Sequence, residues 1–184
     1  PISIDIAELR LAEARFLRAY IYFSMVKRYG GVPLITKVQQ LEDSEDILYP
    51  VRNSEKEVYD FVISEMDAIA ETLDQTTEYG RAHKSAALAL QCRAALFAAS
   101  TAQFGEVQLS GLLGITDGEA NSYYQQAYDA ANTIITQGPF ELYNKNPDKV
   151  QNFKDIFLDE RNIETIMAKV HDGPGFLQGG TSTW

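Results

Sequence analysis

Acidic side chains are the first candidates for chemistry, because glycoside hydrolysis uses two carboxylates placed across a cleft. The chain has 26 Asp and Glu residues, and pairs such as Asp155 with Glu160 or Asp159 with Glu164 lie close in sequence. Closeness in sequence does not place two groups across a cleft. We therefore interpret these side chains as surface carboxylates and predict no catalytic residues.

Histidine and cysteine offer metal-binding or nucleophilic chemistry, but neither type is clustered. His83 and His171 are far apart and belong to no His-Glu-x-x-His or cysteine-rich pattern. Cys92 is the single cysteine and lies in an alanine-rich stretch, where a buried, unreactive thiol is expected. The nucleophile-elbow and phosphate-loop motifs are absent from the sequence. We predict no metal, no cofactor and no enzyme activity, and interpret His83 as a surface residue at a helix start.

Two other charged features have structural interpretations. Arg81 comes just before an alanine-rich stretch and could bind an acidic ligand, but an ion pair with a carboxylate earlier in the chain is favoured. The acidic run at residues 42–46 lacks the glycine and the final glutamate of a calcium-binding loop. We expect a solvated loop there.

Aromatic residues near the C-terminus are candidates for carbohydrate recognition, because a flat ring packs against the apolar face of a sugar. Trp184 is the only tryptophan and follows Gly-Gly-Thr-Ser-Thr, and Phe176 lies in the same glycine-rich segment. We predict Trp184 and Phe176 as carbohydrate-binding residues, with a core anchor or a truncated, disordered chain end as the alternatives for Trp184. One ring burying ~100 Å² contributes about 2.5 kcal/mol. Micromolar affinity needs roughly 8 kcal/mol, so further residues must contribute.

The composition is that of one folded, acidic domain. The 184-residue chain is 45% hydrophobic and 11% aromatic, with a formal net charge of -10. Nucleic-acid binding needs clustered Lys and Arg, so this class of function is excluded. No apolar run reaches the roughly 20 residues of a membrane-spanning helix, and no signal-peptide hydrophobic region is present. Because the chain lacks an initiator Met, we expect a fragment of a longer protein.

The elements that position these residues begin with a long aromatic helix. Apolar residues over 9–26 recur at steps of three and four and predict a helix to about Tyr29, capped by Ser3 or Asp5. The Gly-Gly-x-Pro turn at residues 30–33 ends it, with Gly30 or Gly31 in a left-handed conformation. A second apolar row, which predicts a helix packed on two sides, comprises Leu17, Ile21 and Met25.

Two further helices follow an extended segment over residues 30–52. Ser54 and Glu57 form a capping box that begins the second helix, and the break at residues 76–80 ends it. The third helix, over about 82–102, is rich in alanine. Small side chains let neighbouring helices approach closely, so we expect this helix to be central and the most buried.

The C-terminal part changes character. A fourth helix, capped by Asn121 or Ser122, is predicted to end at Gly138. Beyond it, we expect a short helix around residues 153–157 and an extended piece over 164–170. We therefore predict an all-α fold of helical hairpins, with residues 1–140 as a tetratricopeptide-like core and 141–184 as a loop-rich extension. A strict 34-residue repeat is not visible.

Four sequence blocks, in order, resemble the SusD/RagB family of outer-membrane nutrient-binding lipoproteins of Bacteroidetes. They are the aromatic run and Arg-Tyr-Gly-Gly-Val-Pro-Leu turn within 13–35, the segment 54–73, the Gly-Arg-Ala-x-Lys motif opening 80–93, and the segment 123–143. The resemblance implies tetratricopeptide-like hairpins and a structural role for the Gly80-Arg81 motif.

The same resemblance implies a function without catalysis. Family members capture glycans, or in some cases peptides, as surface-exposed lipoproteins and deliver them to a TonB-dependent, SusC-like transporter. The expected partners are thus an oligosaccharide or other nutrient and the transporter, with a lipid anchor outside this segment as the only membrane contact. Two alternatives stay open: a helical-repeat scaffold that binds a protein or peptide in an intracellular compartment, and an all-α glycoside hydrolase.

Overall fold

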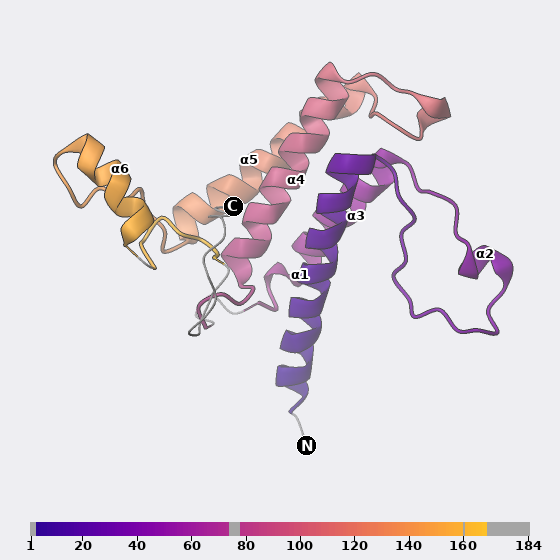
Figure 1. Ribbon diagram of the computed structural model, residues 1–184, viewed down its shortest axis with the longest axis horizontal. Helices are drawn as coiled ribbons and strands as arrows, with labels where there is room; N and C mark the ends of the chain where they lie inside the picture. The colour runs from indigo at the N-terminus through magenta and orange to yellow at the C-terminus, as the bar shows by residue number, and fades with distance from the viewer. Residues whose placement is uncertain (1–2, 74–77, 160, 169–184) are drawn as a thin grey trace.

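The computed structural model describes residues 3–73, 78–159 and 161–168. Within these residues the long helices are α1 (Ile4–Tyr29), α3 (Glu55–Ala70), α4 (Lys84–Phe104) and α5 (Ala120–Gln137), which run alternately up and down in Figure 1. Each packs on the next: α1 on α3, α3 on α4 and α4 on α5. The predicted all-α fold of tetratricopeptide-like hairpins is confirmed. No helix within the described residues is long and apolar enough to cross a bilayer.

The ends of α1 follow the sequence signals closely. The Ser3 hydroxyl accepts a hydrogen bond from the Ile6 amide, 3.4 Å away, as a helix cap does. At the other end Gly30 has a φ of 67° and a ψ of -134°, a positive φ but not the left-handed helical conformation expected. At Gly31 a Cβ atom would lie 2.0 Å from the Asn53 carbonyl oxygen, so only glycine lets these two chain segments cross.

One side of α1 forms the core, and the other side lies open. The predicted core stripe is confirmed: its buried members are Ala12, Phe16, Ala19, Phe23 and Val26, with Leu9 and Tyr20 partly buried against them. The prediction that the second apolar row is also packed was wrong, because Leu17 and Ile21 are 55% and 56% exposed, although Met25 is partly buried. Among the described elements α1 packs mainly on α3, and nothing covers its opposite side.

The start of α3 is the predicted capping box. The Ser54 hydroxyl accepts from the Glu57 amide at 3.2 Å, and the Glu57 carboxylate accepts from the Ser54 amide at 2.7 Å. The connection before it was expected to be extended throughout, but it contains one helical turn, α2 (Glu45–Leu48). This turn forms because the amides of Ile47 and Leu48 both donate to the Ser44 carbonyl, 3.0 Å away.

The alanine-rich helix α4 is the centre of the molecule, as predicted. It packs against α3 on one side and α5 on the other. Its fully buried positions are alanines, namely Ala87, Ala94, Ala95, Ala98 and Ala99. Because alanine leaves the backbones room to approach, three helices can pack closely here. Cys92 is only half-buried, but burial still raises the pKa of its thiol, which fits an unreactive side chain.

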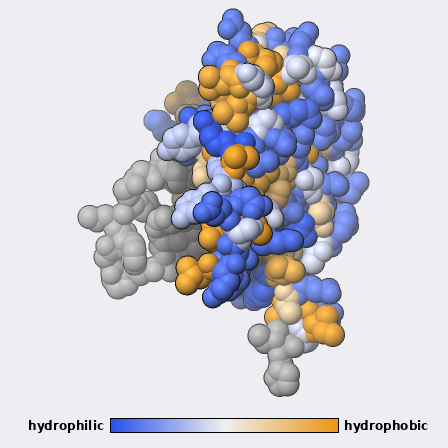
Figure 2. Space-filling model, turned by 90° about the vertical axis from the view of Figure 1, so that its right-hand side faces the viewer, coloured by the Kyte–Doolittle hydropathy of each residue, from blue (hydrophilic) through white to orange (hydrophobic). Residues whose placement is uncertain are grey.

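The connection from α4 to α5 is partly helical. It contains two 3₁₀ turns, η1 (Leu109–Gly111) and η2 (Asp117–Glu119), and α5 begins directly after the second. Asn121 and Ser122 therefore lie inside α5 and cap nothing, which corrects the prediction. The predicted end at Gly138 is confirmed, since its amide donates to the Ile134 carbonyl at 2.8 Å. The exposed apolar residues near this connection are Phe104, Val107 and Leu109, and Figure 2 shows a hydrophobic patch at the top of the molecule.

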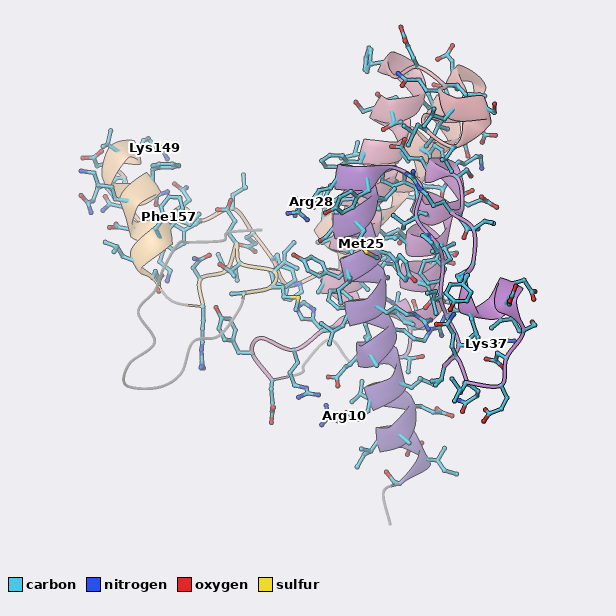
Figure 3. The ribbon with its side chains drawn as sticks, turned by 45° about the vertical axis from the view of Figure 1, so that its right-hand side comes forward. Arg10, Met25, Arg28, Lys37, Lys149 and Phe157 are labelled. Carbon is cyan, nitrogen blue, oxygen red and sulfur yellow. The ribbon has the colours of Figure 1, made fainter. Side chains whose placement is uncertain are left out.

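Beyond α5 the described chain leaves the bundle. The short predicted helix is present as α6 (Lys149–Leu158), which contacts none of the other helices in the described part of the chain. Figure 3 shows Lys149 and Phe157 on this helix, away from the bundle. The extended piece expected over 164–170 begins instead with turns in its described portion, and residues 169 and 170 lie outside the described residues.

Candidate functional site

A groove of about 490 Å³ lies between α3 and α5. The backbones of these two helices do not pack on each other, although the Tyr123 hydroxyl of α5 reaches Asp60 of α3. The floor is formed by α4, which packs on both. The lining residues are Asp60, Ile63, Ser64, Asp67, Leu88, Gln91, Gln126, Asp129, Ala130 and Thr133. The volume falls within the roughly 300 to 1,000 Å³ of small-molecule sites.

Each wall of the groove is one face of a helix. On α3 the polar lining residues Asp60, Ser64 and Asp67 are four and three positions apart, and the lining residues of α5 between 126 and 133 follow the same spacing. Side chains three or four positions apart share one face of a helix. The capping box at Ser54 fixes where α3 begins and thereby which face it presents.

The groove is acidic. Asp60, Asp67 and Asp129 are lining residues, and none of the described lining residues is Lys or Arg. Asp60 has partners at its edge: the Lys56 ammonium lies 2.7 Å away, and the Tyr123 hydroxyl donates to its carboxylate at 2.5 Å. Burial, together with the neighbouring Asp60 carboxylate, raises the pKa of Tyr123 well above its ordinary value.

The predicted sugar-binding residues cannot be compared with this groove. Phe176 and Trp184 lie outside the described residues. The described lining offers carboxylate, amide and hydroxyl groups but no aromatic ring. The groove therefore lacks the flat apolar face that sugar rings pack against.

An ion-pair cluster of one glutamate and two arginines holds the first hairpin together. The Glu65 carboxylate accepts hydrogen bonds from Arg15 at 3.0 and 2.7 Å and from Arg18 at 2.9 Å. The bond from Arg15 is the main cause that lowers the pKa of the Glu65 carboxyl, with Arg18 adding to it and burial opposing both. This arrangement links α1 to α3 and uses three of the roughly four acceptor positions of the carboxylate.

Arg81 has the internal partner that the sequence favoured. Its guanidinium Nε donates to the Glu13 carboxylate at 2.7 Å, and its Nη2 makes a second bond to the same group. Arg10 also donates to Glu13, at 2.8 Å. Glu13 is a buried residue of α1, so this network ties the segment before α4 to the first helix.

His83 is at the start of α4, as predicted, but is not a simple surface residue. Its ring is half-buried, stacks on Phe140 with centroids 6.0 Å apart, and its Nε2 lies 2.8 Å from the Ile166 carbonyl oxygen. These contacts hold the chain after α5 against α4. Within the described residues no group of three or more His, Cys, Asp or Glu could hold a metal ion.

The carboxylates considered for hydrolysis are engaged by nearby protein groups. Asp159 pairs with the Lys145 ammonium at 2.6 Å, and Glu164 accepts from the Tyr143 amide at 3.0 Å. Asp155 accepts from the Asn146 amide at 3.0 Å. Glu160 lies outside the described residues.

Sequence reasoning did not identify the groove residues, among them Asp67, Gln91 and Asp129. A signal was present, because polar residues on α3 and on α5 recur at steps of three and four. That spacing is also typical of an ordinary solvated helix face. Only the packing of α4 between the two helices makes one groove of them.

Two antiparallel hairpins with a polar groove between the second and fourth long helices define a tetratricopeptide-like helical module. Residues 6–96 match the model of the SusD-like family described as starch-binding and associating with the outer membrane. A SusD-like protein of Bacteroides ovatus is 38% identical over 79 residues, which are 42% of this chain and 14% of that protein. These matches support the interpretation of the chain as a SusD/RagB-like fragment.

Solved structures agree with this assignment. A SusD-like protein of Bacteroides fragilis matches 94% of this chain and 29% of its own, with 29% identity and a TM-score of 0.71. Another structure, determined with a xylogluco-oligosaccharide, matches 77% of this chain and 26% of its own, with 26% identity and a TM-score of 0.58. The chain thus spans less than a third of each of these proteins.

Proposed function

We propose that this protein binds glycans at the outer membrane without altering them and delivers them to a TonB-dependent, SusC-like transporter. The observation that carries the proposal is the similarity to a structure determined with a xylogluco-oligosaccharide. The family description, starch-binding and associating with the outer membrane, supports it. The proposal includes a surface-exposed lipoprotein as the form in which the protein acts.

In this proposal the described helices are the scaffold, and the sugar is bound elsewhere. Phe176 and Trp184 are the proposed sugar platforms, on a loop-rich extension over 141–184 that follows a helical core over 1–140. The contacts of His83 with Phe140 and Ile166 support a fixed position for the start of this extension against α4. A platform held on a rigid element binds with less loss of conformational freedom.

Binding without catalysis is supported by the described carboxylates. Asp155, Asp159 and Glu164 each accept a hydrogen bond from a neighbouring group of the same region. A general acid of a glycosidase instead needs a raised pKa and a free path to the glycosidic oxygen. The Lys145 hydrogen bond has the opposite effect and lowers the pKa of Asp159.

Isothermal titration of the complete protein with xyloglucan and starch oligosaccharides tests binding. Trp184→Ala and Phe176→Ala are expected to weaken it by about tenfold each, since each removes an aromatic contact of order 1 to 2 kcal/mol. Tyr49→Ala is the matched control, because Tyr49 is an exposed aromatic residue on the connection between α2 and α3. Folded protein that binds none of the glycans would refute the proposal.

Delivery and the absence of catalysis need separate measurements. The complete protein is expected to co-purify with a SusC-like transporter and to leave fluorescently labelled oligosaccharides intact. Release of labelled sugar by folded protein would establish a hydrolase instead. Glycan binding without any recovered transporter would refute delivery while leaving binding in place.

A further inference from the structure

Gln91 is a buried amide that faces the groove without a partner. The residue lies on α4 at the groove floor and is only 9% exposed. Among the described residues no hydrogen bond involves its side chain. An amide offers one acceptor oxygen and two N–H donors, and buried polar groups are normally hydrogen-bonded. The amide atoms of Gln91 are not among the fully buried atoms that lack a partner, so water in the groove reaches them, and a ligand that enters the groove can replace this water.

The walls on either side of Gln91 carry unpaired negative charge. Asp67 on α3 and Asp129 on α5 are exposed lining residues, and neither is in an ion pair within the described part of the chain. Asp60 is neutralised in part by Lys56. With a formal net charge of -10 on the whole chain, the field around the groove attracts cations.

The remaining lining distinguishes between kinds of cationic ligand. Ile63, Leu88 and Ala130 give the walls and floor of the groove apolar surface, which suits the methylene stems of lysine and arginine side chains. The Gln91 amide matches the paired N–H and C=O groups of a peptide main chain. The groove also lies between two helices, as do sites in other helical modules that hold extended segments.

We propose that the groove between α3 and α5 binds a polypeptide segment bearing lysine or arginine. Gln91 pairs with its main chain, and Asp67 and Asp129 pair with its cationic side chains. The inference does not rest on glycan binding.

Fluorescence anisotropy with a labelled octalysine peptide tests the proposal on the 184-residue chain. A matched octamer of alternating Ser and Gly is the neutral probe and is expected to bind at least tenfold more weakly. The double variant Asp67→Asn/Asp129→Asn is expected to weaken octalysine binding by about tenfold, because it removes both unpaired charges from the walls. Circular dichroism of each variant establishes that the fold is retained.

A matched control separates the groove from the overall charge. Glu8→Gln/Glu42→Gln removes the same two charges from exposed positions, on α1 and on the connection after it. It is expected to change the affinity less than twofold. If both double variants weaken binding equally, the peptide is held by the net charge of the chain and the proposal is overturned.

Gln91→Leu tests the amide on its own. It is expected to weaken binding about threefold to tenfold at low and at high salt alike, whereas the effect of the aspartate variants shrinks as salt screens charges. Unchanged affinity in Gln91→Leu would overturn the main-chain pairing. Maltohexaose that displaces octalysine from the wild-type chain but not from the groove variants would make the groove a sugar site and overturn the ligand class.

Discussion

Glu65 and Asp67 lie two residues apart on α3 and have opposite surroundings. Glu65 faces α1, where Arg15 and Arg18 hold its carboxylate with three hydrogen bonds. Asp67 faces the groove, and no cationic side chain is present among the described lining residues. One helix therefore carries a carboxylate paired with arginines on one side, which we call the closed cluster. On its other side it carries an unpaired carboxylate, which with Asp129 across the groove we call the open cluster.

The two carboxylates differ in their partners because they differ in their exposure to solvent. The Glu65 side chain is only 14% exposed, and a charge taken so far out of water is unfavourable unless it is paired. Asp67 stays solvated and needs no partner. The paired carboxylate thus indicates how the hairpin is held, whereas the unpaired one, in the groove that the Gln91 amide also lines, indicates where a ligand can be held.

The largest expected effect comes from breaking the closed cluster. Glu65→Gln should lower the free energy of unfolding by about 2 kcal/mol, because two partly buried arginines lose their counter-ion. This figure lies below that for a fully buried pair, since each arginine side chain is about one-third exposed. Urea denaturation measures it, with Glu8→Gln as a control expected to stay within about 0.5 kcal/mol of wild type. Equal effects would remove the distinction between the two kinds of carboxylate.

Glu13→Gln tests the ion pairs of Glu13 with Arg81 and Arg10, a second closed cluster. It should lower the free energy of unfolding by about 1 to 1.5 kcal/mol. The Glu13 side chain is buried, but its partners Arg81 and Arg10 are more exposed than the arginines around Glu65. Water therefore replaces part of the lost interaction. The measurement is again urea denaturation, and a loss larger than that of Glu65→Gln would reverse the expected order.

Local and pairwise features were predictable from the sequence, as was the central place of the alanine-rich helix α4, whereas whether another element covers an apolar face of α1 was not. The capping box at Ser54 needs only residues three apart, and the ion pair of Arg81 needs only a carboxylate earlier in the chain. The second apolar row of α1 failed because its spacing gives a face without showing whether another element covers it. The groove at Gln91 could not be predicted, since it exists only where α4 packs between α3 and α5.

The contribution of Glu65 should depend on pH in a defined direction. Hydrogen bonds from Arg15, with smaller help from Arg18, hold its pKa below the ordinary value of 4.5. The unfolded chain then binds the proton first as pH falls, so this stabilisation is complete above 4.5 and is lost as pH falls through the folded pKa.

The measurement is the difference in unfolding free energy between wild type and Glu65→Gln. It should be constant between about pH 6 and 7.5 and shrink below pH 4.5. Other carboxyl groups titrate in both proteins and cancel. A difference that persists unchanged at pH 3 would mean that the glutamate stabilises the hairpin through packing and not through its charge.

The smallest expected effect on stability comes from the open cluster. Asp67→Asn/Asp129→Asn should change the free energy of unfolding by no more than about 0.5 kcal/mol, because both side chains are solvated and removing two like charges costs nothing in the folded state. Urea denaturation at low salt measures this change. A loss above 1 kcal/mol would show that these aspartates hold α3 and α5 in place, and the contrast with Glu65 would then fail. Near-neutral stability combined with weakened peptide binding would instead separate the two roles on the same helix, because only the groove side would respond to the ligand.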